Sequence, residues 1–134
     1  MIGQQYDALI LGGGPAGATM ALLLARAGWS VAVLEKSNFP RNKVWGEFLS
    51  ATNIQLLQEL GIADAFSLHA GPQVDKVGLF AGRMILSAQT PQPHQPNSFW
   101  GWGHALRRER LDTMLLNRVK KVARRCGNPG KQLS

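Results

Sequence analysis

The chain has 134 residues, of which 45% are apolar, and a formal net charge of +7. This length provides one domain with a hydrophobic core but not two, and the single cysteine, Cys126, excludes an internal disulfide and a multi-cysteine metal site. The three histidines are scattered, and the apolar stretches are too short to cross a membrane. We therefore expect a cytoplasmic protein with no metal and no transmembrane segment.

The first predicted elements are a strand, a helix and a second strand, which run from about Tyr6 to Lys36. The turn after the first strand contains Gly12, Gly14 and Gly17, which fill a G-x-G-x-x-G pattern. Glu35 ends the second strand, 18 residues past Gly17, close to the interval at which an acid binds a ribose in dinucleotide sites. The combination predicts a dinucleotide site; the alternative is a glycine-rich turn without a ligand.

Each glycine of the turn has a physical role in this interpretation. Gly12 permits a tight turn, Gly14 lets the backbone approach a pyrophosphate, and Gly17 lets the helix and strand pack closely. Pro15 and Ala16 stand between the last two glycines, where the predicted helix begins. The N–H groups and the positive end of this helix would face the phosphates.

A loop is predicted over residues 37–47, because proline, glycine and mixed charges do not suit a regular element. Ser50 is then the expected N-cap of a second helix that ends at Gly61. One more helical turn is expected over residues 64–69. Two strands, residues 74–80 and 84–87, indicate a hairpin, and they are followed by a proline-rich loop over 90–97 and a short strand within 100–106.

Basic residues gather near the C-terminus, where nine of the fifteen lysines and arginines lie from Arg107 onward, against only Glu109 and Asp112 as acids. The spacing of the apolar residues predicts an amphipathic helix whose apolar face packs on the sheet and whose basic face is solvated. We do not expect nucleic-acid binding, because no recognised module or aromatic platform accompanies the charge. Residues 1–126 are predicted to form the domain, and residues 127–134 a disordered tail.

With these segments placed, the chain resembles the N-terminal part of FAD-dependent oxidoreductases, in the branch that holds geranylgeranyl reductases, aromatic-ring hydroxylases and flavin-dependent halogenases. Three stretches carry the resemblance: the glycine motif with its terminal acid (7–35), the loop FPRNKVWGEFLS (39–50), and RERLDTML (108–115). The last is similar to the R-x-x-[FL]-D-x-x-L helix start of the family. The fold implied is α/β, a Rossmann-like FAD-binding βαβ unit with an added β-hairpin and helices, truncated at its C-terminal side.

The resemblance also implies roles for individual residues. The glycines would hold the FAD pyrophosphate, Glu35 the adenosine ribose, Arg41 and its neighbours the ribityl chain or flavin edge, and Arg108 (or Arg107 if the register slips) the phosphate or adenine side. The alternative for Arg41 and Arg108 is an ordinary surface arginine. The full set of expected cofactor-binding residues is Gly12, Gly14, Pro15, Ala16, Gly17, Glu35, Lys36, Arg41, Lys43, Gly46, Glu47 and Arg108.

Two departures limit what the resemblance implies about activity. Trp45 stands where the family often has cysteine, and the second FAD motif of the family, a G-D stretch, would lie beyond residue 134. No catalytic acid or base can be named, since Glu47 and His104 are the nearest candidates and each is better explained as structural.

We therefore expect an FAD-binding oxidoreductase of the monooxygenase or reductase type, or an N-terminal fragment of one. NAD(P)H is an implied reductant, an isoprenoid or aromatic small molecule the implied substrate, and a complementing C-terminal part an implied partner. The alternatives are a truncated non-catalytic product and a fragment of an NAD(P)-dependent Rossmann dehydrogenase.

Overall fold

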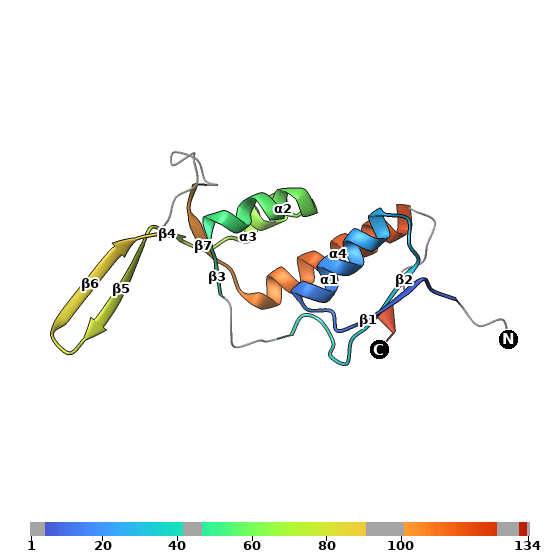
Figure 1. Ribbon diagram of the computed structural model, residues 1–134, viewed down its shortest axis with the longest axis horizontal. Helices are drawn as coiled ribbons and strands as arrows, with labels where there is room; N and C mark the ends of the chain where they lie inside the picture. Colours follow the sequence, from blue (N-terminus) through green and yellow to red (C-terminus); the bar gives the residue numbers. More distant parts are fainter. Residues whose placement is uncertain (1–4, 42–46, 91–100, 126–131, 134) are drawn as a thin grey trace.

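The computed structural model describes residues 5–41, 47–90, 101–125 and 132–133, and within them strands gather into three small sheets (Figure 1). The elements, in chain order, are β1 (Ala8–Leu11), α1 (Pro15–Arg26), β2 (Val31–Leu34), β3 (Phe48–Leu49), the 3₁₀ turn η1 (Ala51–Asn53), α2 (Ile54–Leu60), α3 (Ala63–His69), β4 (Gln73–Val74), β5 (Lys76–Ala81), β6 (Met84–Gln89), β7 (Gly103–Ala105), α4 (Arg108–Arg125) and β8 (Gln132–Leu133).

The predicted βαβ unit is confirmed: β1 and β2 are parallel neighbours, with Ala8 opposite Val31, and α1 connects them. A third parallel strand, β8, pairs with the other edge of β2, where Leu34 lies opposite Leu133. The two residues of β8 fall within the predicted tail, residues 127–134, and the rest of that segment lies outside the described residues. The edge of β2 that does not pair with β1 offers N–H and C=O groups to this further strand.

Glycine and proline residues mark the two ends of helix α1. Gly14 is the N-cap, Pro15 occupies the first turn, and Gly28 follows the helix with a φ of +89°, a conformation that favours glycine. The buried residues recur at helical spacing and are small on average: Ala18, Ala21, Leu22 and Ala25. A face of this kind lets a neighbouring helix approach closely.

That neighbour is α4, which lies along α1 in the right-hand half of the molecule (Figure 1). The expected amphipathic helix is confirmed, with a buried face made of Leu111, Leu115, Leu116, Val119 and Ala123. Its packing partners differ from the expectation, however. The prediction placed this face on the sheet, whereas its most extensive packing is against α1, with α3 as a further contact. The alanines of α1 explain this, because they leave room for a second helix at its side.

A second layer combines α2 and α3 with the antiparallel sheet β3–β7–β4. Gly61 ends α2 with a φ of +71°, as predicted for the helix stop. Ser50 does not cap α2 directly: η1 intervenes, and Ser50 precedes η1 without a side-chain hydrogen bond to the helix backbone. Phe66 of α3 is fully buried and packs edge-on against the ring of His104 from β7, which places His104 in the core.

Two arginines from other helices bind the carbonyl end of α2. Arg26 of α1 donates to the carbonyl oxygens of Glu59 and Leu60, each at 2.8 Å. Arg118 of α4 donates from Nε to the carbonyl oxygen of Leu60 at 3.3 Å. Cations at a helix C-terminus satisfy orphan carbonyls and complement the helix dipole, so part of the positive charge has a structural role.

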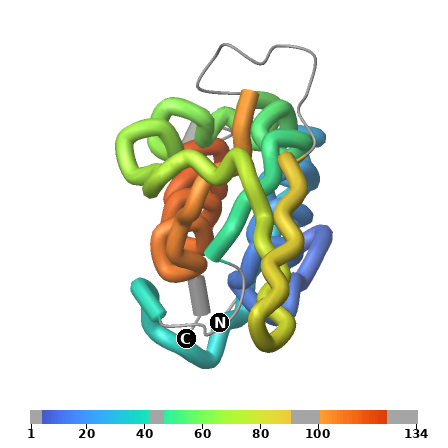
Figure 2. Tube along the Cα trace, turned by 90° about the vertical axis from the view of Figure 1, so that its left-hand side faces the viewer, coloured from blue at the N-terminus to red at the C-terminus, as the bar shows by residue number. Residues whose placement is uncertain are grey.

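The predicted hairpin is present as β5 and β6, which extend away from the helices in Figure 1 and face the viewer in Figure 2. Every residue of both strands is exposed, including the large apolar side chains Leu79, Phe80, Ile85 and Leu86. The parallel sheet also has an open face, on which Leu9 and Leu11 are 59% and 78% exposed. Among the described helices, none combines the length and apolar character needed to cross a membrane.

Candidate cofactor site

The glycine turn joins β1 to α1 in a geometry that two of its glycines make possible. Gly12 has a φ of +98°, and its N–H donates to the carbonyl oxygen of Leu34 at 2.7 Å. A Cβ on Gly17 would collide with the carbonyl oxygen of Gly12 and would lie 3.2 Å from Cγ2 of Ile10. The prediction that Gly17 allows close helix–strand packing is therefore confirmed, and the Gly12 conformation fits the predicted tight turn.

The N-terminus of α1 presents a positive end to the space beside this turn. Gly14 caps the helix in an extended conformation, Pro15 follows it, and Ala16 is exposed. The first turn contains no acidic residue. The first N–H groups of a helix have no partner within the helix, and the helix dipole adds to their attraction for anions. The arrangement suits a phosphate group.

Glu35 lies directly beside the glycine turn and is only 6% exposed. Its Oε2 accepts a hydrogen bond from the N–H of Gly13 at 2.8 Å, while Oε1 accepts from the N–H of Ser37 at 2.9 Å and from Nη1 of Arg41 at 3.0 Å. Burial alone raises the pKa of Glu35, but the N–H groups of Gly13 and Ser37 and the charge of Arg41 outweigh it and hold the pKa below its ordinary value. Glu35 is thus ionised at neutral pH.

Arg41 completes the link between the acid and the turn. Its side chain is 16% exposed, its guanidinium lies 4.9 Å from the centroid of the Phe39 ring, and Nη2 is 3.5 Å from the position that a Cβ on Gly14 would occupy. Within the described residues, the buried Nε of Arg41 has no hydrogen-bond partner. A buried N–H without an acceptor is costly, so this atom is suited to an acceptor that a ligand would supply.

Asp112 of α4 joins the same cluster, although the sequence interpretation gave it no role. It is fully buried, and Arg108 donates to it from Nε at 3.1 Å and from Nη2 at 3.5 Å. Nη2 of Arg41 lies 4.0 Å from Oδ2 of the same carboxylate. The i, i+4 spacing of Arg108 and Asp112 was a readable signal for their pairing, but the approach of Arg41 depends on the tertiary structure.

The structure brings some of the predicted site residues together and leaves others apart. Arg108 reaches the cluster through Asp112, whereas the side chains of Lys36 and Glu47 are exposed. Glu47 uses its carbonyl oxygen to accept the N–H of Leu106 at 2.7 Å, beside the β3–β7 pair. Lys43 and Gly46 lie outside the described residues, as does Trp45.

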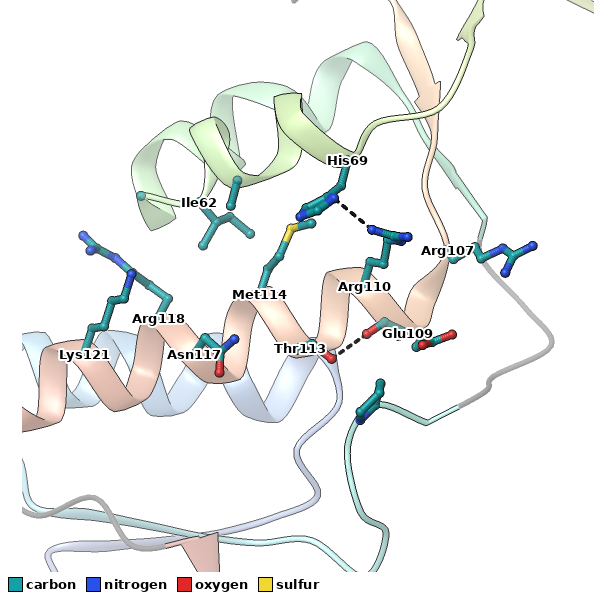
Figure 3. A pocket seen from close by; sticks show the side chains of 13 residues that line it. Ile62, His69, Arg107, Glu109, Arg110, Thr113, Met114, Asn117, Arg118 and Lys121 are labelled. Carbon is teal, nitrogen blue, oxygen red and sulfur yellow. Dashed lines mark hydrogen bonds between the residues drawn. The ribbon is translucent and has the colours of Figure 1, made fainter.

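A separate groove of about 470 Å³ lies between α3 and α4 (Figure 3). Nη1 of Arg110 lies 2.8 Å from Nδ1 of His69 across this groove, and Met114 and Ile62 add apolar surface. Arg118 also lines the groove, and its Nε donates to the carbonyl oxygen of Leu60 at the end of α2. Arg107, the alternative to Arg108 if the register of the motif slips, is exposed and lines this groove.

A parallel βαβ unit with a glycine turn, a helix N-terminus and a buried acid at the end of the second strand defines a Rossmann-like dinucleotide-binding fold. The chain belongs to the FAD-binding domain family, whose profile matches residues 5–124.

Individual relatives agree with this assignment. The chain is 32% identical to a menaquinone reductase of Mycobacterium tuberculosis over 121 residues, which cover 90% of this chain and 27% of the relative. It is 47% identical over 64 residues to the 1H-pyrrole-2-carbonyl-[peptidyl-carrier protein] chlorinase of Pseudomonas fluorescens, covering 48% of this chain and 14% of that protein. The chain thus spans about a quarter of the length, or less, of these two relatives.

Solved structures show the same fold. The myxobacterial chondrochloren halogenase, described as a variant of FAD-dependent halogenases, superimposes with a TM-score of 0.75 and 25% identity over 95% of this chain and 28% of that one. A flavoprotein/dehydrogenase from Cytophaga hutchinsonii gives a TM-score of 0.70 and 28% identity over 94% of this chain and 30% of that one.

Proposed function

We propose that the glycine turn, Glu35 and Arg41 bind the ADP part of FAD and that this chain supplies the nucleotide-binding part of a flavin-dependent oxidoreductase. One observation carries the proposal: a buried, ionised Glu35 is held against the glycine turn by Gly13 and Arg41, next to the positive end of α1. Residues 5–124 match the FAD-binding domain family, which supports FAD as the ligand.

The residues present fit such a ligand. Gly14 leaves the space beside Arg41 that a side chain would fill, and a guanidinium is well suited to the oxygens of a diphosphate because it offers several donors in one plane. Glu35 accepts hydrogen bonds from Gly13, Ser37 and Arg41 in the structure, and an ionised carboxylate offers only acceptor atoms. It is therefore the kind of group that can accept a hydrogen bond from a ribose hydroxyl.

When bound, FAD supplies the redox chemistry, while the protein supplies binding, orientation and electrostatics. We propose NAD(P)H as the reductant of the flavin and an aromatic or isoprenoid small molecule as the substrate. The similarity to a menaquinone reductase and to a 1H-pyrrole-2-carbonyl-[peptidyl-carrier protein] chlorinase supports a small-molecule substrate.

We also propose that further polypeptide completes the substrate side. The chain spans 27% of the menaquinone reductase. Two apolar surfaces of the described structure would then be covered: the open face of the parallel sheet at Leu9 and Leu11, and the β5–β6 hairpin. Burial of such surfaces is the main favourable term in association.

The proposal is tested by titrating the purified chain with FAD and following flavin fluorescence, with gel filtration to detect flavin that co-elutes with a compact protein. Gly14→Val should abolish co-elution, because its side chain would enter the space beside Arg41. Gly78→Val, in the exposed hairpin strand β5, is the matched control and should bind FAD like the parent. A folded chain that binds no FAD, or one that prefers NAD⁺ or NADP⁺ in competition, would overturn the proposal.

A further inference from the structure

We propose that Asp112 is a positioning residue: it fixes the guanidiniums of Arg41 and Arg108 beside the glycine turn in the geometry that binds the cofactor diphosphate. The inference rests on the proposed FAD binding, and it goes beyond it by assigning a role to a carboxylate that no ligand is proposed to touch. It also predicts that neutralising Asp112 weakens FAD binding, whereas charge attraction alone predicts tighter binding.

The placement of Asp112 is the first step. It lies in the second turn of α4, is fully buried, and receives two hydrogen bonds from Arg108, at 3.1 and 3.5 Å. The next turn of the same helix carries Leu116, whose methyl groups lie 3.4 Å from the position of a Cβ on Gly13. Helix α4 therefore lies next to the glycine turn, and a group fixed on α4 is held near that turn.

Arg41 is the second step, because it spans two carboxylates from different elements. Nη1 lies 3.0 Å from Oε1 of Glu35, and Nη2 lies 4.0 Å from Oδ2 of Asp112. The loop that carries Arg41 follows β2, so the contact with Asp112 joins this loop to α4. The hydrogen bond to Glu35 and the longer ion pair with Asp112 act on opposite ends of the guanidinium and limit its rotation, and a restricted group loses less entropy on binding a ligand.

The electrostatic balance makes the inference testable. The cluster contains two carboxylates and two guanidiniums, so Asp112 cancels positive charge near the proposed diphosphate position. If Asp112 affected the ligand through charge alone, its neutralisation would strengthen FAD binding. If it positions the arginines, neutralisation releases them and weakens binding. The sign of the change in affinity separates the two roles.

The experiment compares FAD dissociation constants of the full chain and its Asp112→Asn variant, which keeps the shape of the side chain. We expect binding about tenfold weaker, which is typical of coupled neighbouring residues. Glu109→Gln is the matched control, since Glu109 lies in the first turn of the same helix but is not in the cluster; it removes the same charge and should leave the affinity unchanged. Thermal unfolding verifies that each variant is folded.

Removal of a partner from a buried ion pair can unfold a protein, so a second comparison covers that case. Asp112→Asn combined with Arg108→Gln removes both charges of the pair and is compared with Arg108→Gln alone. Weaker FAD binding by the double variant supports the inference, because it reports the loss of the Arg41 anchor. Equal or tighter binding by the double variant, or by a folded Asp112→Asn protein, overturns it while FAD binding by the parent stands. Failure of the parent to bind FAD overturns both proposals.

Discussion

The carboxylate of Glu35 accepts a hydrogen bond from the backbone N–H of Gly13 at 2.8 Å, although the two residues are 22 positions apart. This contact connects the end of β2 to the turn after β1. The same two segments are aligned by the N–H of Gly12, which donates to the carbonyl oxygen of Leu34. The acid proposed to bind a ribose therefore also stabilises the turn proposed to bind the phosphates.

Glu35→Gln should lower stability in a pH-dependent way. Because the folded-state pKa of Glu35 is depressed, its stabilising effect is present above the unfolded-state pKa of about 4.3 and is lost as pH falls through the folded-state value. We expect the variant to be about 1–3 kcal/mol less stable at pH 7, as for hydrogen bonds to a charged group, with a smaller difference at pH 3. Urea unfolding at both pH values measures this.

Asp7 would add to the pH dependence of this series, because its pKa is also lowered, mainly by the Ser30 hydroxyl and further by the Ser30 N–H. Asp7 therefore contributes acid-sensitive stability with the same sign. The Glu35 comparison is best made in an Asp7→Asn background, where this second contribution is absent. The difference in stability between the Asp7→Asn protein and its Glu35→Gln derivative should decrease from pH 7 to pH 3. A constant difference would contradict the conclusion that the folded-state contacts of Glu35 depend on its charge.

Gly17→Ala should destabilise the chain by about 1–3 kcal/mol, as for other overpacked sites, because its Cβ would collide with the carbonyl oxygen of Gly12. Backbone cannot move aside as a side chain can, so α1 and β1 would have to separate. Gly13→Ala is the control: its Cβ would meet side-chain carbons of Leu116 and Phe39 at 3.4 and 3.5 Å, an ordinary contact. Thermal unfolding compares the two, and equal effects would refute the close-packing role.

Arg41→Lys should weaken FAD binding by about tenfold, because lysine keeps the charge but loses the planar set of donors. It also loses the guanidinium contact with the Phe39 ring. Arg83→Lys, in the exposed turn between β5 and β6, makes the same chemical change at a distance and should bind FAD normally. Fluorescence titration compares the FAD affinities of the two variants. Unchanged affinity in Arg41→Lys would remove Arg41 from the proposed site.

The hairpin should be dispensable for the stability of the helical core. Lys76 and Gln89 are opposite each other in the β5–β6 register, so residues 77–88 can be replaced by a two-residue Asn-Gly turn, which favours a tight hairpin. The removed side chains are exposed, and we expect the midpoint of thermal unfolding to change little and light scattering on heating to decrease. A large drop in the midpoint would show that the hairpin stabilises the rest of the chain.

Local patterns were sufficient for much of the fold. The positions of Gly12, Gly14 and Gly17, together with the acid after the second apolar run, predicted the βαβ unit, because turns, helix starts and strand alternation depend on neighbouring residues. The αL stop of α2 at Gly61 and the hairpin were predictable for the same reason. Pairing of Arg108 with Asp112 follows from helical spacing.

The tertiary structure decided which distant segments meet. Sequence spacing could not show that α4 packs on α1, that β8 extends the parallel sheet, or that Arg41 lies between Glu35 and Asp112. These contacts join residues up to about a hundred positions apart, and their choice depends on shape and on the pairing of buried charges rather than on any local period. The sequence by itself determined the glycine turn and its acid, and the folded chain decided the charges that surround them.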